Sequence, residues 1–131
     1  MESLFLIMNN KKILIVDDEL DVLEFLSYNF KKQNYHVACA LNGKEGIKIA
    51  HEFKPHIIIS DIMMPIMNGN VMSETLGADA NLKNTPVIFL SAVQDEITVL
   101  RAAKSGSDFV SKPISFELLL KIVESHLNTQ P

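Results

Sequence analysis

Five side chains that could act together on a phosphoryl group each lie at the end of an apolar stretch of this sequence. Two carboxylates follow ILIV, a third follows IIIS, a hydroxyl ends VIFLS and an ammonium group follows DFVS. Carboxylates bind hard cations, whereas serine and lysine side chains donate to phosphoryl oxygens. The side chains are those of Asp17, Asp18, Asp61, Ser91 and Lys112.

Three carboxylates brought close together need a counter-charge. A like-charged pair at ~4 Å costs about 4 kcal/mol at an effective dielectric constant of ~20, and one lysine neutralises three aspartates only in part. Mg²⁺ binds one or two carboxylates together with waters and phosphoryl oxygens. We therefore expect a Mg²⁺ site in which Asp61 is the nucleophile and forms an aspartyl phosphate.

The elements that must position these side chains alternate along the chain. Apolar runs predict strands, and apolar residues at helical spacing predict helices after them. Strands are expected at 11–16, 35–40, 55–60, 85–91 and 108–111, and helices at 19–34, after a cap at Asn42, and at 94–106 and 115–127. Residues 70–85 carry a further helical pattern that ends in a polar loop. This alternation predicts an α/β fold with a doubly wound parallel sheet and right-handed crossovers. Parallel strands end at one edge, the carboxyl edge, where the five side chains should converge.

Composition narrows the class of protein. The chain has 131 residues, 47% of them hydrophobic, which fits one domain with one core. Its net charge of -4 provides no field for holding nucleic acid or an anionic membrane. No apolar stretch approaches the ~20 residues that span a bilayer, and the N-terminal residues make a poor signal peptide. The single cysteine, Cys39, fits a reducing compartment, so we expect a cytoplasmic protein. The four histidines form no metal-like cluster in the sequence and are expected to be solvated or satisfied locally.

Taken together, the motifs resemble the response-regulator receiver domain of bacterial two-component signalling. The resemblance covers residues 11–127 and rests on ILIVDDE, SDIMMPIMNG, PVIFLSA and GSDFVSKPI, in the order and at the spacing of that family. It implies a single flavodoxin-like domain with a five-stranded parallel sheet in the order 2-1-3-4-5 and five helices. Residues 1–10 would then be an N-terminal extension and residues 128–131 a C-terminal tail.

The resemblance also implies a role for each residue at the carboxyl edge. Asp61 would be the phosphorylated residue, Asp18 would bind Mg²⁺ directly and Asp17 would act mostly through water. The backbone carbonyl of Met63 would supply a further ligand to the metal. Ser91 and Lys112 would each bind a phosphoryl oxygen. Glu19 is expected to begin the first helix, where its charge suits the helix dipole, and to take no part in the chemistry.

Two further expectations concern signalling. The resemblance places a switch at Ser91 and Phe109, in which Ser91 moves toward the phosphoryl oxygen and the aromatic ring turns inward, changing the face made by the fourth and fifth helices. The bulky apolar side chains of Met63 and Val93 should slow hydrolysis of the aspartyl phosphate. Pro113 would follow a cis peptide bond, as in the family.

The resemblance implies partners and leaves alternatives open. The phosphoryl group would come from a sensor histidine kinase or a phosphotransfer protein, and the signal would pass to an output domain or protein, or to a phosphorylation-dependent homodimer. We therefore expect a signalling domain rather than an enzyme, either alone or as the receiver module of a hybrid kinase or longer regulator. An Asp-nucleophile phosphohydrolase would want an acid at Met63, and a flavodoxin-like cofactor binder would want a phosphate-cradling loop in place of VDDEL. A degenerate receiver that serves only for docking would not need the complete set.

Overall fold

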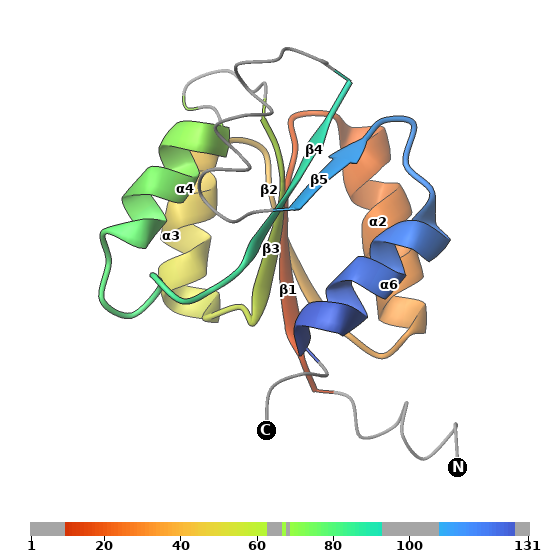
Figure 1. Cartoon of the computed structure of the whole chain (residues 1–131), viewed down its shortest axis with the longest axis horizontal. Coiled ribbons are helices and arrows are strands. Elements are labelled where there is room, and N and C mark those ends of the chain that lie inside the picture. Colours follow the sequence, from red (N-terminus) through yellow and green to blue (C-terminus); the bar gives the residue numbers. More distant parts are fainter. Residues whose placement is uncertain (1–9, 63–66, 68, 93–107, 128–131) are drawn as a thin grey trace.

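A computed structural model of the chain describes residues 10–62, 67, 69–92 and 108–127. Strands and helices alternate along these residues (Figure 1). The strands are β1 (Lys12–Val16), β2 (His36–Ala40), β3 (Ile57–Asp61), β4 (Val87–Ser91) and β5 (Asp108–Ser111). The helices are α2 (Leu20–Lys32), α3 (Gly43–Phe53), α4 (Gly69–Gly77) and α6 (Phe116–Leu127).

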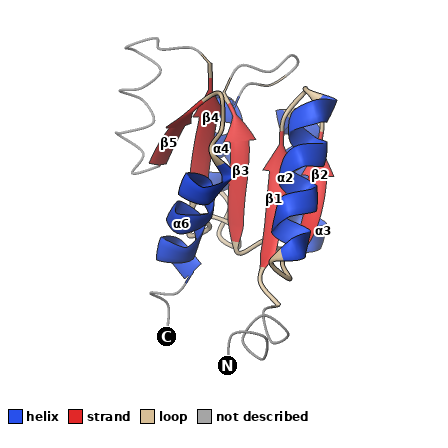
Figure 2. Ribbon diagram, turned by 90° about the vertical axis from the view of Figure 1, so that its right-hand side faces the viewer, coloured by secondary structure: helices blue, strands red, loops and turns tan. Residues whose placement is uncertain are grey.

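The five strands form one parallel sheet in the order β2-β1-β3-β4-β5, which confirms the predicted topology. In Figure 2 their arrows all point the same way, so their carboxyl ends share one edge. The expected helix at 94–106 lies outside the described residues, and four helices belong to the described part of the chain.

Helices cover both faces of this sheet and make two hydrophobic clusters. In Figure 1, α2 and α6 lie on one side of the sheet, whereas α3 and α4 lie on the other. Successive side chains of β1 point to opposite faces of the sheet and so belong to both clusters. Ile13 and Ile15 pack under α2 and α6, while Leu14 and Val16 pack under α3 and α4. This two-sided burial fixes the strands whose ends carry the polar side chains.

Local chemistry explains where the elements begin and end. Asn42 caps α3 as expected, since its side-chain oxygen accepts the Glu45 N–H at 2.9 Å. Within 70–85, α4 ends at Gly77, and the expected polar loop follows it. The carboxylate of Asp79 accepts the Asn81 N–H at 2.8 Å and so favours a turn over further helix. Leu82, which lies in the segment after the helix, is buried.

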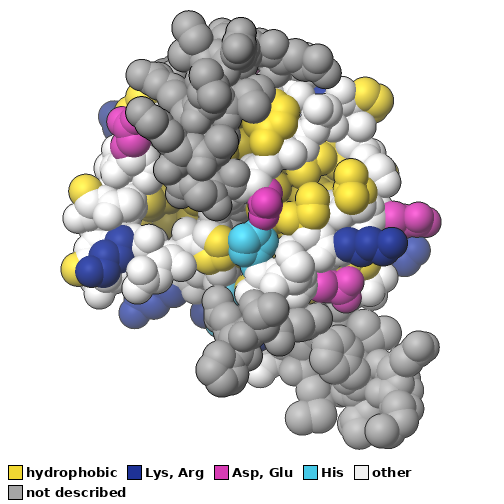
Figure 3. Space-filling view, in the orientation of Figure 1, with side chains coloured by type: hydrophobic (Ala, Val, Ile, Leu, Met, Phe, Trp, Pro, Cys, Tyr) yellow, Lys and Arg dark blue, Asp and Glu magenta, His cyan; other side chains and the backbone are white. Residues whose placement is uncertain are grey.

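The surface is mixed in character. No helix of the described residues is long and apolar enough to cross a membrane. On the face drawn in Figure 3, the visible basic side chains are interspersed with acidic ones, and hydrophobic side chains lie between them.

Candidate functional site

Strand register brings the predicted site residues to one edge. Val16 of β1 pairs with Ser60 of β3, so the residues that follow them, Asp17 and Asp61, end neighbouring strands. On the next strand Leu90 pairs with Asp61, and Ser91 follows it. Ser91 in turn pairs with Ser111 of β5, and the Lys112 N–H donates to the Ser91 carbonyl at 3.0 Å. The sheet therefore gathers all five side chains along its carboxyl edge.

An acidic cluster forms the centre of this edge. Asp17, Asp18, Glu19 and Asp61 each offer a carboxylate oxygen, and these oxygens lie within 4.8 Å of one another. Asp17 is 0% exposed and Asp61 is 5% exposed, whereas Asp18 and Glu19 are exposed. Two carboxylates are thus held inside the protein surface and two stand at its rim.

Lys112 reaches across this cluster from the end of β5. Its Nζ lies 3.0 Å from Asp17 Oδ2, 3.0 Å from Glu19 Oε1 and 3.5 Å from Asp61 Oδ2. The Lys112–Pro113 peptide bond is cis, as the resemblance implied. Lys112 therefore contacts the buried carboxylates and one rim carboxylate at the same time.

Glu19 lies within this group, although its expected absence from the chemistry stays a prediction. It is the N-cap of α2 with extended backbone dihedral angles, so it precedes the first helical residue and stays with the loop that leaves β1. Its N–H donates to Asp17 Oδ1 at 2.9 Å, and its carboxylate pairs with Lys112. The three consecutive acids DDE indicated that Glu19 could lie beside the two aspartates. Its contact with Lys112 could not be predicted in this way, because it depends on how the chain passes from β5 to α6.

Burial and charge act in opposite directions on these groups. Burial raises the pKa of Asp17 above its usual value, although the Glu19 N–H and Lys112 favour the ionised form. Burial tends to lower the pKa of Lys112, but hydrogen bonds to Glu19 and Asp17 and the charge of Asp61 outweigh it and raise that pKa overall. Lys112 therefore stays an ammonium group at neutral pH.

The set of ligand atoms fits a hard divalent cation. Four carboxylates that converge within 4.8 Å and include two buried ones are oxygen ligands of the kind that Mg²⁺ prefers. Lys112 contacts three of the four, and its single positive charge offsets only part of the negative charge when all four are ionised. The assignment of Asp18 to direct binding and of Asp17 to binding through water stays a prediction, as does the Met63 carbonyl, which lies outside the described residues.

Two glycines allow the backbone to close tightly beside Asp61. A Cβ at Gly69 would lie 2.4 Å from the Asp61 carbonyl oxygen, and the Gly69 N–H donates to the Ile62 carbonyl at 2.9 Å. A Cβ at Gly43 would likewise lie 2.6 Å from the Met67 carbonyl oxygen. At Gly69 and at Gly43 a larger residue would therefore collide with backbone, a constraint that the motifs of the sequence did not reveal.

The predicted switch residues lie on adjacent strands. Ser91 is 1% exposed at the end of β4. Phe109 of β5 is half-buried, pairs in register with Phe89 and packs against the cluster under α3 and α4. The ring therefore borders the core while keeping part of its surface in solvent. Val93, proposed with Met63 to slow hydrolysis, lies outside the described residues.

An apolar groove adjoins the acidic cluster. It has a volume of about 480 Å³ and shares Glu19 and Lys112 with the cluster. Its apolar wall comes from α2 and from the segment after Lys112, namely Val22, Phe25, Pro113 and Ile114.

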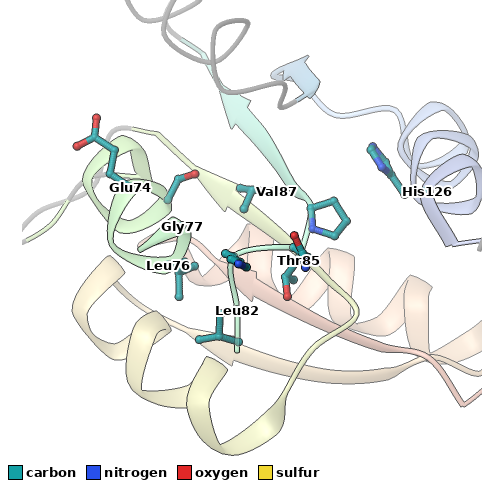
Figure 4. Close-up of a pocket in the computed structure, with 11 residues that line it drawn as sticks. Glu74, Leu76, Gly77, Leu82, Thr85, Val87 and His126 are labelled. Atoms are coloured by element: carbon teal, nitrogen blue, oxygen red, sulfur yellow. The ribbon is translucent and has the colours of Figure 1, made fainter. Parts of the chain in front are cut away.

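A second hollow, of about 350 Å³, lies at the opposite edge of the sheet, where α4 and the segment before β4 face His126. Figure 4 shows Glu74 and His126 on opposite sides of it, so these two titratable side chains do not converge. The acidic edge is therefore the better candidate for chemistry.

The chain is similar to known proteins of one family. Residues 13–124 match the family model described as the response regulator receiver domain. Chemotaxis protein CheY4 of Vibrio cholerae is 27% identical, with a TM-score of 0.84 over 91% of this chain and 100% of that one. The receiver domain of a signal transduction histidine kinase from Syntrophus aciditrophicus is 31% identical, with a TM-score of 0.83 over 91% of each chain. A CheX-CheY complex with BeF3 and Mg from Borrelia burgdorferi contains a similar chain, 28% identical with a TM-score of 0.78 over 88% of this chain and 87% of that one.

Proposed function

The chain belongs to the response-regulator receiver family, and on that premise we propose that it accepts a phosphoryl group on Asp61 from a phosphohistidine. The donor is a sensor histidine kinase or a phosphotransfer protein. The observation that carries this proposal is the arrangement of Lys112, whose ammonium group contacts the buried carboxylates of both Asp17 and Asp61 at the carboxyl edge.

The transfer exchanges one bond to phosphorus for another. An Asp61 carboxylate oxygen attacks the phosphorus in line with the leaving nitrogen, the P–O bond forms and the P–N bond breaks. The electron pair of the broken bond returns to the imidazole nitrogen of the donor. Asp61 is suited to this role because it is nearly buried at the end of a central strand and is held between β1 and β4.

Other residues of the edge bind and orient the group. Asp17, Asp18 and Asp61, with the carbonyl of Met63, would hold Mg²⁺, which when bound supplies the positive charge that lets a phosphoryl group approach carboxylates. Lys112 donates to one phosphoryl oxygen and Ser91 to another. Because the charge of a transferring phosphoryl group is spread over its oxygens, these donors favour the transition state through position and charge.

The donor protein docks in the apolar groove beside the acidic cluster. This groove shares Lys112 and Glu19 with the cluster, so a partner helix that packs on Phe25 and Ile114 would hold its phosphohistidine at the phosphoryl site. Phe25 is 46% exposed, which is unusual for a phenylalanine and leaves apolar surface for a partner.

Phosphorylation changes the surface around Phe109 of β5, which packs on the α3 and α4 side of the sheet rather than on the side of the docking groove. In the proposed switch, Ser91 moves toward a phosphoryl oxygen and Phe109 turns further into the cluster against which it already packs. The changed face then engages an output domain, a partner protein or a second copy of the chain. The likeness to a histidine kinase receiver domain supports the reading of this chain as a module of a hybrid kinase or longer regulator.

Intact mass spectrometry tests the proposal directly. The protein is incubated with acetyl phosphate, which loses acetate on transfer, with and without Mg²⁺. One phosphoryl adduct should form, should require Mg²⁺ and should be absent in Asp61→Asn. Asp79→Asn is the matched control, because Asp79 lies near the opposite edge and an asparagine can still accept the Asn81 N–H there. An adduct that survives Asp61→Asn, or that forms equally without Mg²⁺, overturns the assignment.

A further inference from the structure

The Lys112 ammonium group contacts three carboxylates, one of which belongs to Glu19. An ammonium group has three hydrogens, and the Lys112 Nζ has three carboxylate neighbours, Asp17 and Glu19 at 3.0 Å and Asp61 at 3.5 Å. A phosphoryl oxygen that binds Lys112 must therefore replace one of these neighbours or share a hydrogen with it.

The three carboxylates differ in what it costs to release them. The Asp17 side chain is 0% exposed and the Asp61 side chain is 8% exposed, so either would be left in a poorly solvated place. The Glu19 side chain is 60% exposed and would return to water. Glu19 is therefore the neighbour that Lys112 can give up most easily.

Resting on the phosphoryl transfer proposed above, we propose that Glu19 is a positioning residue: the exchangeable counter-ion that holds Lys112 between transfers and yields it to the phosphoryl group. In the free protein the Lys112 Nζ lies 3.0 Å from both Glu19 Oε1 and Asp17 Oδ2 and 3.5 Å from Asp61 Oδ2, so Glu19 and Asp17 together hold the ammonium group beside Asp61. When a phosphoryl group arrives, its oxygens compete with Glu19 for the same hydrogen.

This role predicts effects of opposite sign on the cation and on the phosphoryl group. The Glu19 carboxylate oxygen lies within 4.8 Å of those of the three aspartates, so its charge helps to attract a divalent cation. The same charge competes with the phosphoryl group for Lys112. Removing it should weaken Mg²⁺ binding and yet speed phosphorylation once Mg²⁺ is saturating.

The variant Glu19→Gln separates the two effects. It leaves the backbone N–H that donates to Asp17 in place and removes only the side-chain charge. The matched control is Glu24→Gln, an identical substitution at an exposed position of α2. Phosphorylation by acetyl phosphate is followed by intact mass over a series of Mg²⁺ concentrations, and Mg²⁺ binding is measured separately by calorimetry without a phosphodonor.

We expect Glu19→Gln to raise the Mg²⁺ dissociation constant and the half-saturating Mg²⁺ concentration. The maximal phosphorylation rate should rise by about two- to fivefold, the range typical of an exposed ion pair. Glu24→Gln should change none of these quantities. In a Lys112→Ala background, Glu19→Gln should no longer raise the maximal rate, because the competition for Lys112 is gone.

A maximal rate that is unchanged or lowered in Glu19→Gln overturns the proposal. A fall in both Mg²⁺ affinity and maximal rate would show that Glu19 only attracts the cation. A wild-type protein that forms no adduct at all would instead defeat the proposed phosphoryl transfer, and the inference with it. A wild-type adduct combined with an unaltered Glu19→Gln rate defeats the inference alone.

Discussion

The two edges of the sheet treat ionisable side chains in different ways. At the edge where the strands begin, His56 Nδ1 accepts the Lys12 N–H at 3.0 Å and Lys12 Nζ donates to the Phe53 carbonyl at 3.2 Å. Near the same edge, His126 of α6 pairs with Asp108, the first residue of β5. Ionisable groups there have partners that tie one element to the next.

At the carboxyl edge, negative charges outnumber the positive charge beside them. Four carboxylates lie together, and Lys112 is shared among three of them. Repulsion of this kind lowers stability unless something else offsets it. A cluster of like charges that one lysine only partly offsets therefore indicates chemistry, whereas ionisable groups with local partners indicate a structural role.

The two edges differ most in how the phosphorylation rate should respond when a lysine of each edge is replaced by alanine. Lys112→Ala removes the ammonium group that contacts Asp17 and Asp61, and should slow phosphorylation by roughly 10²- to 10³-fold, as when one charge-stabilising donor is lost. In the described part of the chain, the Lys12 Nζ contacts the carbonyl and the ring of Phe53, far from the carboxyl edge. Lys12→Ala should therefore leave the rate unchanged. Both rates are measured by intact mass with acetyl phosphate.

A circular dichroism spectrum of each lysine variant establishes that it is folded before its rate is interpreted. Equal rates in the two variants would remove the distinction between the edges. A slow Lys12→Ala variant that is fully folded would do the same.

A smaller effect concerns the backbone that closes around Asp61. Gly69→Ala should lower the free energy of unfolding by about 2 kcal/mol, the usual range for overpacking, because its Cβ would meet the Asp61 carbonyl oxygen at 2.4 Å. Gly77→Ala, at the other end of the same helix, meets nothing within 4 Å and should gain up to about 1 kcal/mol from helix propensity. Urea unfolding measures both. A loss at Gly77 equal to that at Gly69 would contradict the role of close packing at the acidic edge.

The sequence predicted those parts of the molecule that depend on local pattern. ILIV and IIIS are apolar on both sides of the strand, so burial between two helical layers followed, and the acids after them fell at one edge because parallel strands end together. The strand order came from the resemblance, since no pattern within a strand specifies its neighbour. The helical pattern within 70–85 was expected to end in a polar loop, but the pattern alone did not locate that end at Gly77.

Contacts between distant segments could not be predicted in the same way. The ion pair of Glu19 with Lys112 depends on the direction in which the chain leaves β5. The fit of Gly69 against the Asp61 carbonyl depends on the path of the loop between them. Both contacts arise from tertiary geometry, and both lie within the candidate site.

The smallest expected effect concerns the structural edge and its dependence on pH. Burial, with the nearby charges of Lys11 and Lys12, lowers the pKa of His56 below its usual 6.5. The unfolded chain therefore takes up a proton first as the pH falls, so His56 contributes stability above pH 6.5 that is lost as the pH falls toward the folded pKa.

His56→Asn keeps an acceptor for the Lys12 N–H and cannot titrate in this range, so its free energy of unfolding should fall less than that of the wild type between pH 7.5 and roughly pH 5. His56→Ala should be less stable than His56→Asn at both pH values, since the Lys12 N–H then loses its acceptor. Urea unfolding at the two pH values measures these free energies. If the free energy of unfolding falls equally in the wild type and in His56→Asn, protonation of His56 does not contribute to the pH dependence of stability.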